Sequence, residues 1–387
     1  MRAKGKATQV DFVGRMEDID ESIWHDCLRI PLEGRFWYKT LEASGLEHQF
    51  TFSYGLIKVN GKPVGIAPCF LHDVPIALVA PRLVAAVLAL LSRVFPRVGY
   101  QRTLFVGSPC SDEGTIGLIE GTSLPEVVNA LAAAVRTKAR QLRAPMIVFK
   151  DFPQGDLPAF TLLREFASTV SYPGTVLALP AAGKEAYYRS LAHTQRHNLL
   201  KKLRRSRELL ALDTSIVTRP SARELAEIFG LFIQTYDRGK TKFERLDLRF
   251  FERISEQAPA KFILQRDQAN GTLVAFMLVF RLGDRIINKF IGLDYHRGTK
   301  AYLYFRLFDA AVDFAYSCGA KEIQSGQTGY RAKLDLGHRL VPLFNVFHHE
   351  NRLVNALFRA IGRRVSWQSL DGDLASYLQA HPDGDHG

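Results

Sequence analysis

The stretch VNGKPVG at residues 59–65 returns in outline as ANGTLVA at residues 269–275, a shift of 210 positions. An Asn-Gly pair readily adopts the positive φ angles that a two-residue type I′ hairpin turn requires. β-rich runs flank both pairs, at residues 51–59 before the first and at residues 262–265 and 274–280 about the second. The two stretches therefore predict two β-hairpins.

Each predicted hairpin is followed by a helix and then by a short strand. The first helix and strand are expected at residues 125–142 and 146–150, and the second pair at residues 302–318 and 321–325. Pro145 falls just past the first helix, and Gly319 stands where a helix commonly ends. The shared order of elements predicts a tandem duplication.

The length of 387 residues exceeds one average domain and agrees with a duplication. A small-residue break, LPAAG at residues 179–183, interrupts the periodicity between the halves. We expect an N-terminal domain at residues 1–178, a C-terminal domain at residues 179–365 and a flexible tail at residues 366–387. The composition, 47% hydrophobic and 23% charged, is that of a globular chain rather than a disordered one.

The 4 cysteines contain no C-x-x-C pair, which argues against a disulfide framework or a thiolate zinc site. The first 18 residues lack the apolar run of a secretory signal, so a cytoplasmic location is expected. Residues 76–95 are apolar, but Pro81 and Arg82 divide them and leave a charge-free core at residues 83–91, too short to cross a bilayer. A buried helix, or a surface helix that touches a membrane or partner, remains open.

The formal net charge is +12, and much of the excess falls in one predicted helix, residues 187–210. The 100° periodicity places four leucines on one stripe (Leu199, Leu200, Leu203, Leu210) and three cations opposite, facing water (Lys201, Lys202, Arg205). Arg196 and Arg207 project close to the leucine stripe, where a guanidinium is costly unless an anion meets it. They are the substrate-binding candidates of this helix, and a solvated helix with snorkelling side chains is the alternative.

Two loops carry most of the other candidate chemistry. Residues 294–301 lie between a predicted strand and a helix start, where free backbone N–H groups and Gly298 favour a pyrophosphate, although a plain turn glycine is the alternative. Residues 325–333, SGQTGYRAK, bring amide, phenol and cationic groups to a strand end, where they can orient an acyl carbonyl or stabilise an oxyanion. A decorated surface loop is the alternative for this second stretch.

Other signals are weaker. Asp237 beside Tyr236, and Asp294, offer carboxylates that can take a proton from an attacking amine, but a loop Asp is often only a turn or cap residue. Cys110 has no visible His partner, and neither His348-His349-Glu350 nor the C-terminal HPDGDHG forms a spaced metal motif. The sequence contains no G-x-G-x-x-G, P-loop, H-E-x-x-H or G-x-S-x-G motif, so dinucleotide enzymes, P-loop ATPases, zincins and typical serine hydrolases are disfavoured.

The two hairpin-helix-strand halves, the basic stretch TQRHNLLKK at residues 194–202 and the Gly326 to Arg331 segment together resemble the FemAB-like branch of the GNAT acyltransferase superfamily. The resemblance spans about residues 20–360 and is strongest in the second half. It implies an α+β fold of two tandem GNAT-like domains, each a mixed, mostly antiparallel sheet flanked by helices. The first domain would be a degenerate copy.

The resemblance also implies roles for individual residues. Arg297 and Gly298 match the pyrophosphate loop, with Thr299 and Lys300 standing where that loop usually has further glycines. Tyr330, Arg331 and Lys333 match the glycine-tyrosine-cation segment on the acceptor side. Together with the candidates read from the residues themselves, the expected catalytic residues are Tyr330, Gln327 and Asp237, and the expected substrate-binding cations are Arg196, Arg207, Arg331 and Lys333.

We therefore expect an N-acyltransferase that moves an acyl group from acyl-CoA, as a co-substrate rather than a tightly bound cofactor, to an amine. The acceptor would be a small amine, an amino sugar or a peptide. A Fem-type peptidyltransferase that uses aminoacyl-tRNA is the second hypothesis. A non-catalytic binder of an anionic polymer or of a membrane surface is the third.

Overall fold

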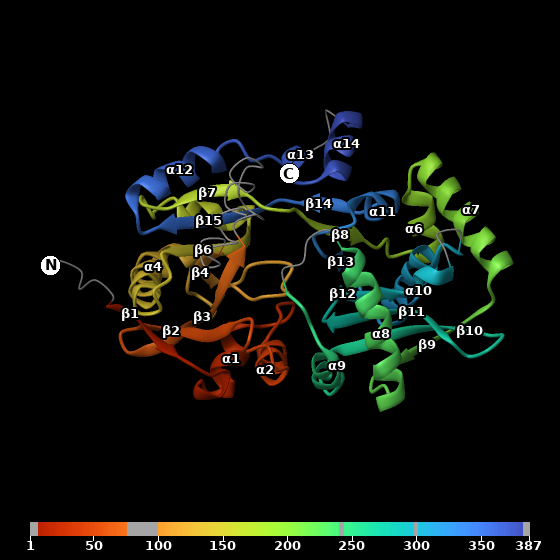
Figure 1. Cartoon of the computed structure of the whole chain (residues 1–387), viewed down its shortest axis with the longest axis horizontal. Helices are drawn as coiled ribbons and strands as arrows, with labels where there is room; N and C mark the ends of the chain where they lie inside the picture. The colour runs from red at the N-terminus through yellow and green to blue at the C-terminus, as the bar shows by residue number, and fades with distance from the viewer. Residues whose placement is uncertain (1–6, 76–99, 240–243, 298–300, 382–387) are drawn as a thin grey trace, which may run out of the picture. The chain divides into compact units, whose positions relative to one another are not determined.

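The computed structural model describes residues 7–75, 100–239, 244–297 and 301–381. Its elements form two compact units, each assembled from three stretches of the chain (Figure 1). Unit 1 comprises Met1–Arg29, Leu46–Tyr172 and Pro342–Leu370, and unit 2 comprises Ile30–Gly45, Pro173–Val341 and Asp371–Gly387. Each unit thus takes in a segment from the opposite end of the sequence.

Unit 1 is built on a sheet with the strand order β1-β2-β3-β4-β6-β15-β7, and β5 pairs with β3 off this path. The strands are β1 (Thr8–Val13), β2 (Thr51–Val59), β3 (Lys62–Pro75), β4 (Tyr100–Val106), β5 (Gly117–Leu118), β6 (Met146–Pro153), β7 (Ala167–Val170) and β15 (Leu343–His349). All pairs are antiparallel except β4 and β6. Those two are parallel because α4 (Leu124–Gln141) forms the crossover between them.

Unit 2 is built on a sheet with the strand order β14-β8-β13-β12-β11-β10-β9. Its strands are β8 (Gly174–Ala178), β9 (Leu212–Val217), β10 (Ala260–Asp267), β11 (Leu273–Leu282), β12 (Arg285–Leu293), β13 (Glu322–Ser325) and β14 (Arg339–Val341). Here β12 and β13 form the parallel pair, and α10 (Leu303–Ser317) is the crossover between them. The same order of pairing therefore occurs twice, which confirms the tandem, mostly antiparallel α+β fold.

In both sheets, a strand from a distant part of the sequence inserts at the equivalent position. In unit 1, β15 inserts between β6 and β7, and in unit 2, β8 inserts between β13 and β14. β15 comes from the C-terminal part of the sequence, whereas β8 precedes nearly all of unit 2. The halves expected at residues 1–178 and 179–365 thus exchange one strand each.

Helices cover both faces of the unit 2 sheet. One face packs against α6 (Lys184–Ser190), α7 (His193–Leu209) and α10, and its core includes Ala275 and Met277 of β11. Phe276 lies between those residues and points to the other face, where it contacts Phe251 of α9 (Leu248–Ser255). The same side holds α8 (Ala222–Arg238) and α2 (Arg35–Ala43). The remaining described α-helices are α1 (Glu21–Cys27), α5 (Leu157–Phe160), α11 (Tyr330–Asp335), α12 (Arg352–Gly362), α13 (Trp367–Leu370) and α14 (Gly372–Ala380).

Both predicted hairpins are present, but their turns differ. Asn60 and Gly61 both have positive φ, 51° and 80°, as a two-residue I′ turn requires. The second prediction of such a turn was wrong. Residues 268–272 form a longer loop in which Gly271 donates its N–H to the Asp267 carbonyl and alone of the Asn-Gly pair has positive φ.

The single helix predicted at residues 187–210 was also wrong, because the chain breaks it into α6 and α7. Leu191 and Ala192 are extended between them. Leu191 is buried, and the Gln195 side chain caps the new start by accepting the Ala192 N–H. The buried stripe of α7 is Leu199, Leu203 and Ser206, because positions spaced by four and three share a face, whereas Leu200 is exposed.

The sequence after Ser366 was expected to be a flexible tail, yet it contains α13 and α14. Asp371 accepts hydrogen bonds from the N–H groups of Asp373 and Leu374, which starts α14. Leu374 and Leu378 of α14 are buried. The apolar residues 83–91 lie outside the described residues, and none of the described helices is long and apolar enough to span a membrane.

Candidate active site

The most distinctive feature of unit 2 is a notch where β12 and β13 part. The two strands pair in parallel from Arg285 with Glu322 to Asn288 with Ser325. β12 then continues to Leu293, paired with β11 alone within the described part of the chain. Half of the backbone N–H and C=O groups of residues 290–292 therefore face a strand edge without a second partner strand among the described residues, and such an edge can pair with an extended ligand.

Unit 1 has no such notch among its described residues. β4 ends at Val106, the residue that makes the last pair with β6. The loop after β4 then folds over this end, and Gly114 donates its N–H to the Asp151 carbonyl at 2.8 Å. A Cβ on Gly114 would lie 2.0 Å from the Lys150 carbonyl oxygen, so the loop is packed tightly there. The comparison favours unit 2 as the working unit.

A β-bulge marks the start of the notch, and it carries a buried ion pair. The pairing of β11 with β12 shifts at Leu278 and Val279, which leaves Lys289 as the extra residue. The Lys289 ammonium lies 2.5 Å from a carboxylate oxygen of Glu33 and 4.6 Å from the centre of the Trp37 ring. The two side chains are only 1% and 10% exposed. Sequence reasoning missed this pair because Glu33 lies 256 positions away.

A chain of hydrogen bonds joins the last paired residues of the two strands. His338 Nδ1 lies 2.9 Å from the Lys333 carbonyl, so this nitrogen carries the proton and donates. Its Nε2 therefore accepts from the Ser325 hydroxyl, 3.2 Å away, and that oxygen accepts from Asn288 Nδ2 at 2.9 Å. Burial, followed by the nearby Lys333 charge, lowers the pKa of His338 to about 3, which keeps the ring neutral. These hydrogen bonds hold β12 and β13 together at the point where the two strands diverge.

A cavity of about 330 Å³ lies beside α11 in the same unit. Its lining comes from α7, α10, α11, α14 and the residue that precedes α11 (Lys202, Phe305, Gly329, Arg331, Ala332, Asp335, Asp373). The Lys202 ammonium lies over the Phe305 ring at 3.9 Å and pairs with Asp335 at 3.2 Å. The expectation that Lys202 simply faces water was therefore wrong, because α10 and α11 cover its stem. The cavity offers two cations and two carboxylates to a polar ligand.

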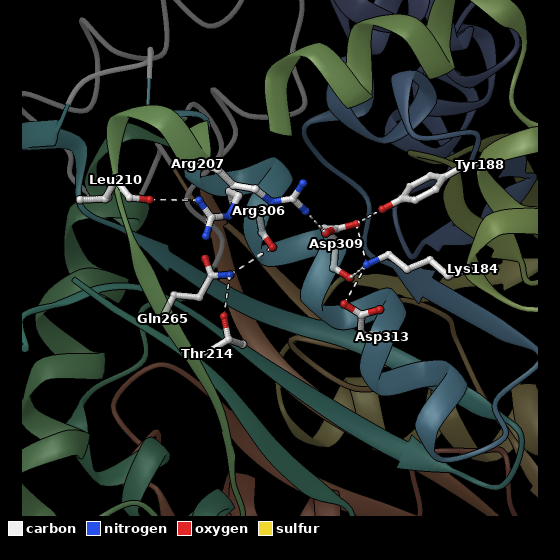
Figure 2. Close-up of polar contacts among 9 residues, drawn as sticks. All are labelled: Lys184, Tyr188, Arg207, Leu210, Thr214, Gln265, Arg306, Asp309 and Asp313. Carbon is white, nitrogen blue, oxygen red and sulfur yellow. Dashed lines mark hydrogen bonds and ion pairs between the residues drawn. The ribbon is translucent and has the colours of Figure 1, made fainter. Parts of the chain in front are cut away.

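A second polar cluster ties α6 and α7 to α10, with Asp309 at its centre (Figure 2). The Asp309 carboxylate pairs with Lys184 at 2.9 Å, accepts the Tyr188 hydroxyl and lies 3.4 Å from Arg207. Lys184 also pairs with Asp313 at 2.7 Å. Burial and the Asp309 charge raise the pKa of Tyr188, so its hydroxyl stays protonated and donates. Arg207 thus has an anionic partner within the chain.

The predicted site residues of the segment after β13 differ in how exposed they are to a ligand. Tyr330 is fully buried, and its hydroxyl donates to the Pro173 carbonyl at 2.9 Å, which favours an anchoring role. Lys333 is also buried, and its ammonium donates to the Gly326 carbonyl at 2.5 Å. Gln327 is half-buried, and Arg331 is exposed at the cavity. Arg331 is therefore the cation of this segment best placed to meet a ligand.

The predicted pyrophosphate loop is described only in part. Gly298, Thr299 and Lys300 lie outside the described residues. Arg297 pairs with Asp267 at 2.7 Å and Asp294 at 3.4 Å. Two carboxylates therefore already neutralise this guanidinium.

Asp237 and Arg196 lie on the helices that border these features. Asp237 is exposed in the last turn of α8, two residues after Thr235, whose hydroxyl accepts the Leu293 N–H at the end of β12. Asp237 therefore lies on a helix rather than in the loop that we expected, and its side chain points away from the side on which Thr235 contacts β12, because residues two apart on a helix do not share a face. Arg196 is half-buried near the start of α7. No group of His, Cys, Asp and Glu suited to a metal ion occurs among the described residues.

Comparison with solved structures agrees with this architecture. FemX matches with a TM-score of 0.58 and 11% identity, over 90% of this chain and 100% of its own. A conserved protein of unknown function from Bacteroides thetaiotaomicron matches with a TM-score of 0.55 and 10% identity, over 88% of this chain and 100% of its own. A tandem GNAT protein from the clavulanic acid biosynthesis pathway gives 0.47 and 12%, over 89% and 99%.

No protein-family model and no curated protein matches the sequence. At 10–11% identity the structural likeness establishes the fold and leaves the reaction open. The fold is that of FemX, which agrees with the FemAB-like resemblance read from the sequence.

Proposed function

We propose that the chain is an N-acyltransferase that moves an acyl group from acyl-CoA to an amine, with its donor site in the notch of unit 2. The observation that carries this proposal is the edge of β12 at residues 290–292, which pairs with no second strand among the described residues and which unit 1 lacks in its described part. The arm of coenzyme A contains amide groups, and an extended chain with amides can pair with a free strand edge as another strand would.

The chemistry requires little beyond binding and polarisation. The amine nitrogen attacks the thioester carbonyl, the tetrahedral intermediate collapses, the C–S bond breaks, and the thiolate takes the proton that the amine gives up. The products are an amide and free CoA. Backbone N–H groups of the open edge would stabilise the oxyanion, and positioning of the two substrates supplies most of the remaining rate.

The predicted residues fit this proposal to different degrees. Asp237, exposed in the last turn of α8, is the candidate base although Thr235 and not Asp237 contacts β12, and Gln327, just after β13, is the candidate for orienting the carbonyl. Arg331 and Lys202 line the adjacent cavity and would meet the polar part of the donor or acceptor. Tyr330 is better suited to hold α11 in place, because its hydroxyl is buried on a backbone carbonyl.

Calorimetric titration with a panel of acyl-CoAs tests the proposal. Wild type should bind at least one of them, and Lys202→Gln or Arg331→Gln should weaken that binding roughly tenfold, the value of one charge-assisted contact. Arg205→Gln, which removes an exposed cation of α7 away from the cavity, is the matched control. Release of thiol from the bound acyl-CoA upon addition of amines then reports turnover. Failure of wild type to bind any acyl-CoA would refute this donor.

An aminoacyl-tRNA donor is the second candidate, and the exposed cations Lys201, Arg204 and Arg205 of α7 favour it. Co-purified RNA and a steep loss of affinity with salt would support that donor. A chain that binds RNA or lipid vesicles and transfers no acyl group would instead be a non-catalytic binder.

A further inference from the structure

The outward face of α12 in unit 1 is apolar, although it is exposed. α12 packs on β7 and β15 with Asn355 and Gly362 on its buried side (Figure 1). The opposite side carries four exposed apolar residues (Leu353, Ala356, Leu357, Ala360). Leu353 is 84% exposed, and Leu357, one turn further on, is 59% exposed. A helix on the surface of a folded protein normally turns polar side chains outward, so this face is suited to an apolar partner.

Polar contacts hold α12 in this orientation. Asn351 caps the helix by accepting two backbone N–H groups of the first turn, at 3.0 and 3.1 Å. The buried Asn355 side chain accepts the His349 N–H of β15 at 2.9 Å, and the Gly362 carbonyl accepts the Thr169 hydroxyl of β7 at 3.0 Å. The helix is therefore tied to two strands, and its leucines cannot turn inward without the loss of these bonds.

The same helix is strongly basic. Residues 351–370 include four arginines and no aspartate or glutamate (Arg352, Arg359, Arg363, Arg364). None of the four forms an ion pair with another described residue, and Glu350, the acid before the helix, pairs with Arg140 at 2.6 Å. Arg352 stands in the first turn, where the positive end of the helix dipole disfavours a cation, so helix stability does not account for it. The charge favours an anionic partner.

We propose that this face of α12, with its two leucines and four arginines, binds the surface of a lipid bilayer that contains anionic headgroups. The leucines enter the boundary between headgroups and acyl chains, and the arginines beside them pair with lipid phosphates. α12 has 11 residues, about half the length that crosses a bilayer, so it lies along the surface. The proposal is independent of the acyl transfer proposed above, because α12 belongs to unit 1 and the proposed donor site belongs to unit 2.

The combination of leucines with arginines favours a bilayer over two other occupants. A second copy of the chain, packed symmetrically, would bring the four arginines against four more, and like charges across an interface repel. Single-stranded RNA would pair with the arginines but not with the leucines, because it binds through phosphate contacts and stacking on aromatic rings. Each alternative predicts a result that differs from that for a bilayer.

Sedimentation of the full chain with vesicles tests the proposal. One set of vesicles contains phosphatidylcholine alone, and the other contains phosphatidylcholine and anionic phosphatidylglycerol in equal parts. Wild type should bind the anionic vesicles at least about tenfold more tightly, because each basic residue near an anionic surface adds about fivefold. Leu353→Gln with Leu357→Gln should weaken this binding by about 10–100-fold through lost apolar burial. Arg363→Gln with Arg364→Gln should weaken it by about 10–30-fold.

α7 supplies matched controls, because it also carries two exposed leucines and two adjacent exposed arginines. Leu200→Gln with Leu209→Gln removes side chains that are 44% and 62% exposed, and Arg204→Gln with Arg205→Gln removes the same charge as the α12 pair. Both should leave vesicle affinity within about twofold of wild type, because charge acts on a surface only within a Debye length. Glutamine keeps helix propensity in every variant, and thermal unfolding checks that each is folded.

The outcomes separate the possible occupants. Binding to anionic vesicles that falls with both α12 pairs and with neither α7 pair supports the proposal. Failure of wild type to bind, equal binding to both kinds of vesicle, or dependence on the α7 pairs instead would overturn it. A dimer that Leu353→Gln dissociates in size-exclusion chromatography, or RNA binding that Arg363→Gln weakens, each without vesicle binding, would also overturn it. Titration with acyl-CoA should give wild-type affinity for the α12 variants, so that failure of either proposal leaves the other standing.

Discussion

The buried pair of Glu33 and Lys289 allows a quantitative test of how unit 2 is held together. Glu33→Leu leaves the Lys289 ammonium, 1% exposed, without its carboxylate. Removal of one partner of a buried pair costs about 3–5 kcal/mol. The Trp37 ring, 4.6 Å from the ammonium, is in contact before and after the change and so does not alter this difference. We therefore expect Glu33→Leu to lower the free energy of unfolding of unit 2 by about 3–5 kcal/mol.

The double variant provides the sharper part of the test. Replacement of a buried pair by apolar groups of similar volume is often neutral. Glu33→Leu with Lys289→Met should therefore lie within about 1 kcal/mol of wild type, well above Glu33→Leu alone. The Arg204 and Glu208 pair, 3.9 Å apart and exposed on α7, is the control, and Glu208→Ala should cost under about 0.5 kcal/mol.

Urea unfolding followed by tryptophan fluorescence measures these differences. The sequence has 3 tryptophans, and Trp37 belongs to unit 2 whereas Trp24 and Trp367 belong to unit 1. A common background with Trp24→Phe and Trp367→Phe makes Trp37 the reporter in every variant. If Glu33→Leu costs under about 1 kcal/mol, or if the double variant is no more stable than Glu33→Leu, the buried pair does not contribute as we argue.

The remaining predictions concern single sites. His338 has a folded pKa of about 3 and an unfolded pKa near 6.5, so below pH 6.5 the unfolded chain gains a proton that the folded chain excludes. Stability should fall by about 1.4 kcal/mol per pH unit from 6.5 toward 3, and urea unfolding of His338→Gln should lack that part of the slope; equal slopes contradict it. Gly114→Ala should destabilise unit 1 by about 1–3 kcal/mol without loss of acyl-CoA affinity, whereas Gly155→Ala, which meets open space, should change little. Burial raises the pKa of Cys69 to about 12, so mass spectrometry should find this thiol unmodified by iodoacetamide at pH 8 in the folded protein, and rapid alkylation would contradict its burial.

The fold was predictable where the signal is local. The pattern of Asn60 with Gly61 fixes positive φ angles within four residues, and the structure has that turn. The helices α4 and α10 follow from apolar periodicity with nearby stop signals, and the sequence placed both within a residue or two. The duplication was readable because each copy repeats the same local signals in the same order.

Local signals failed where a distant contact decides the outcome. The break between α6 and α7 depends on the burial of Leu191, and residues 179–210 contain no proline or glycine at that point to announce it. Lys202 was assigned to solvent because its position on α7 faces away from the leucines, yet Phe305 and Asp335 cover it. The position of a residue on the helical wheel gives the direction of its side chain, but it does not say which other elements of the fold pack against that side chain.

Most of the candidate site consists of features that distant contacts decide. The sequence determined two similar halves, their hairpins and crossover helices, the basic stretch and the polar segment after β13, because these depend on neighbouring residues. Tertiary structure alone decided that β12 extends beyond its pairing with β13 and that a loop fills the matching place in unit 1. It also decided that Glu33 pairs with Lys289 and that Arg207 pairs with Asp309. Such pairings depend on strand register and on the packing of segments up to 256 positions apart, and no local propensity encodes them.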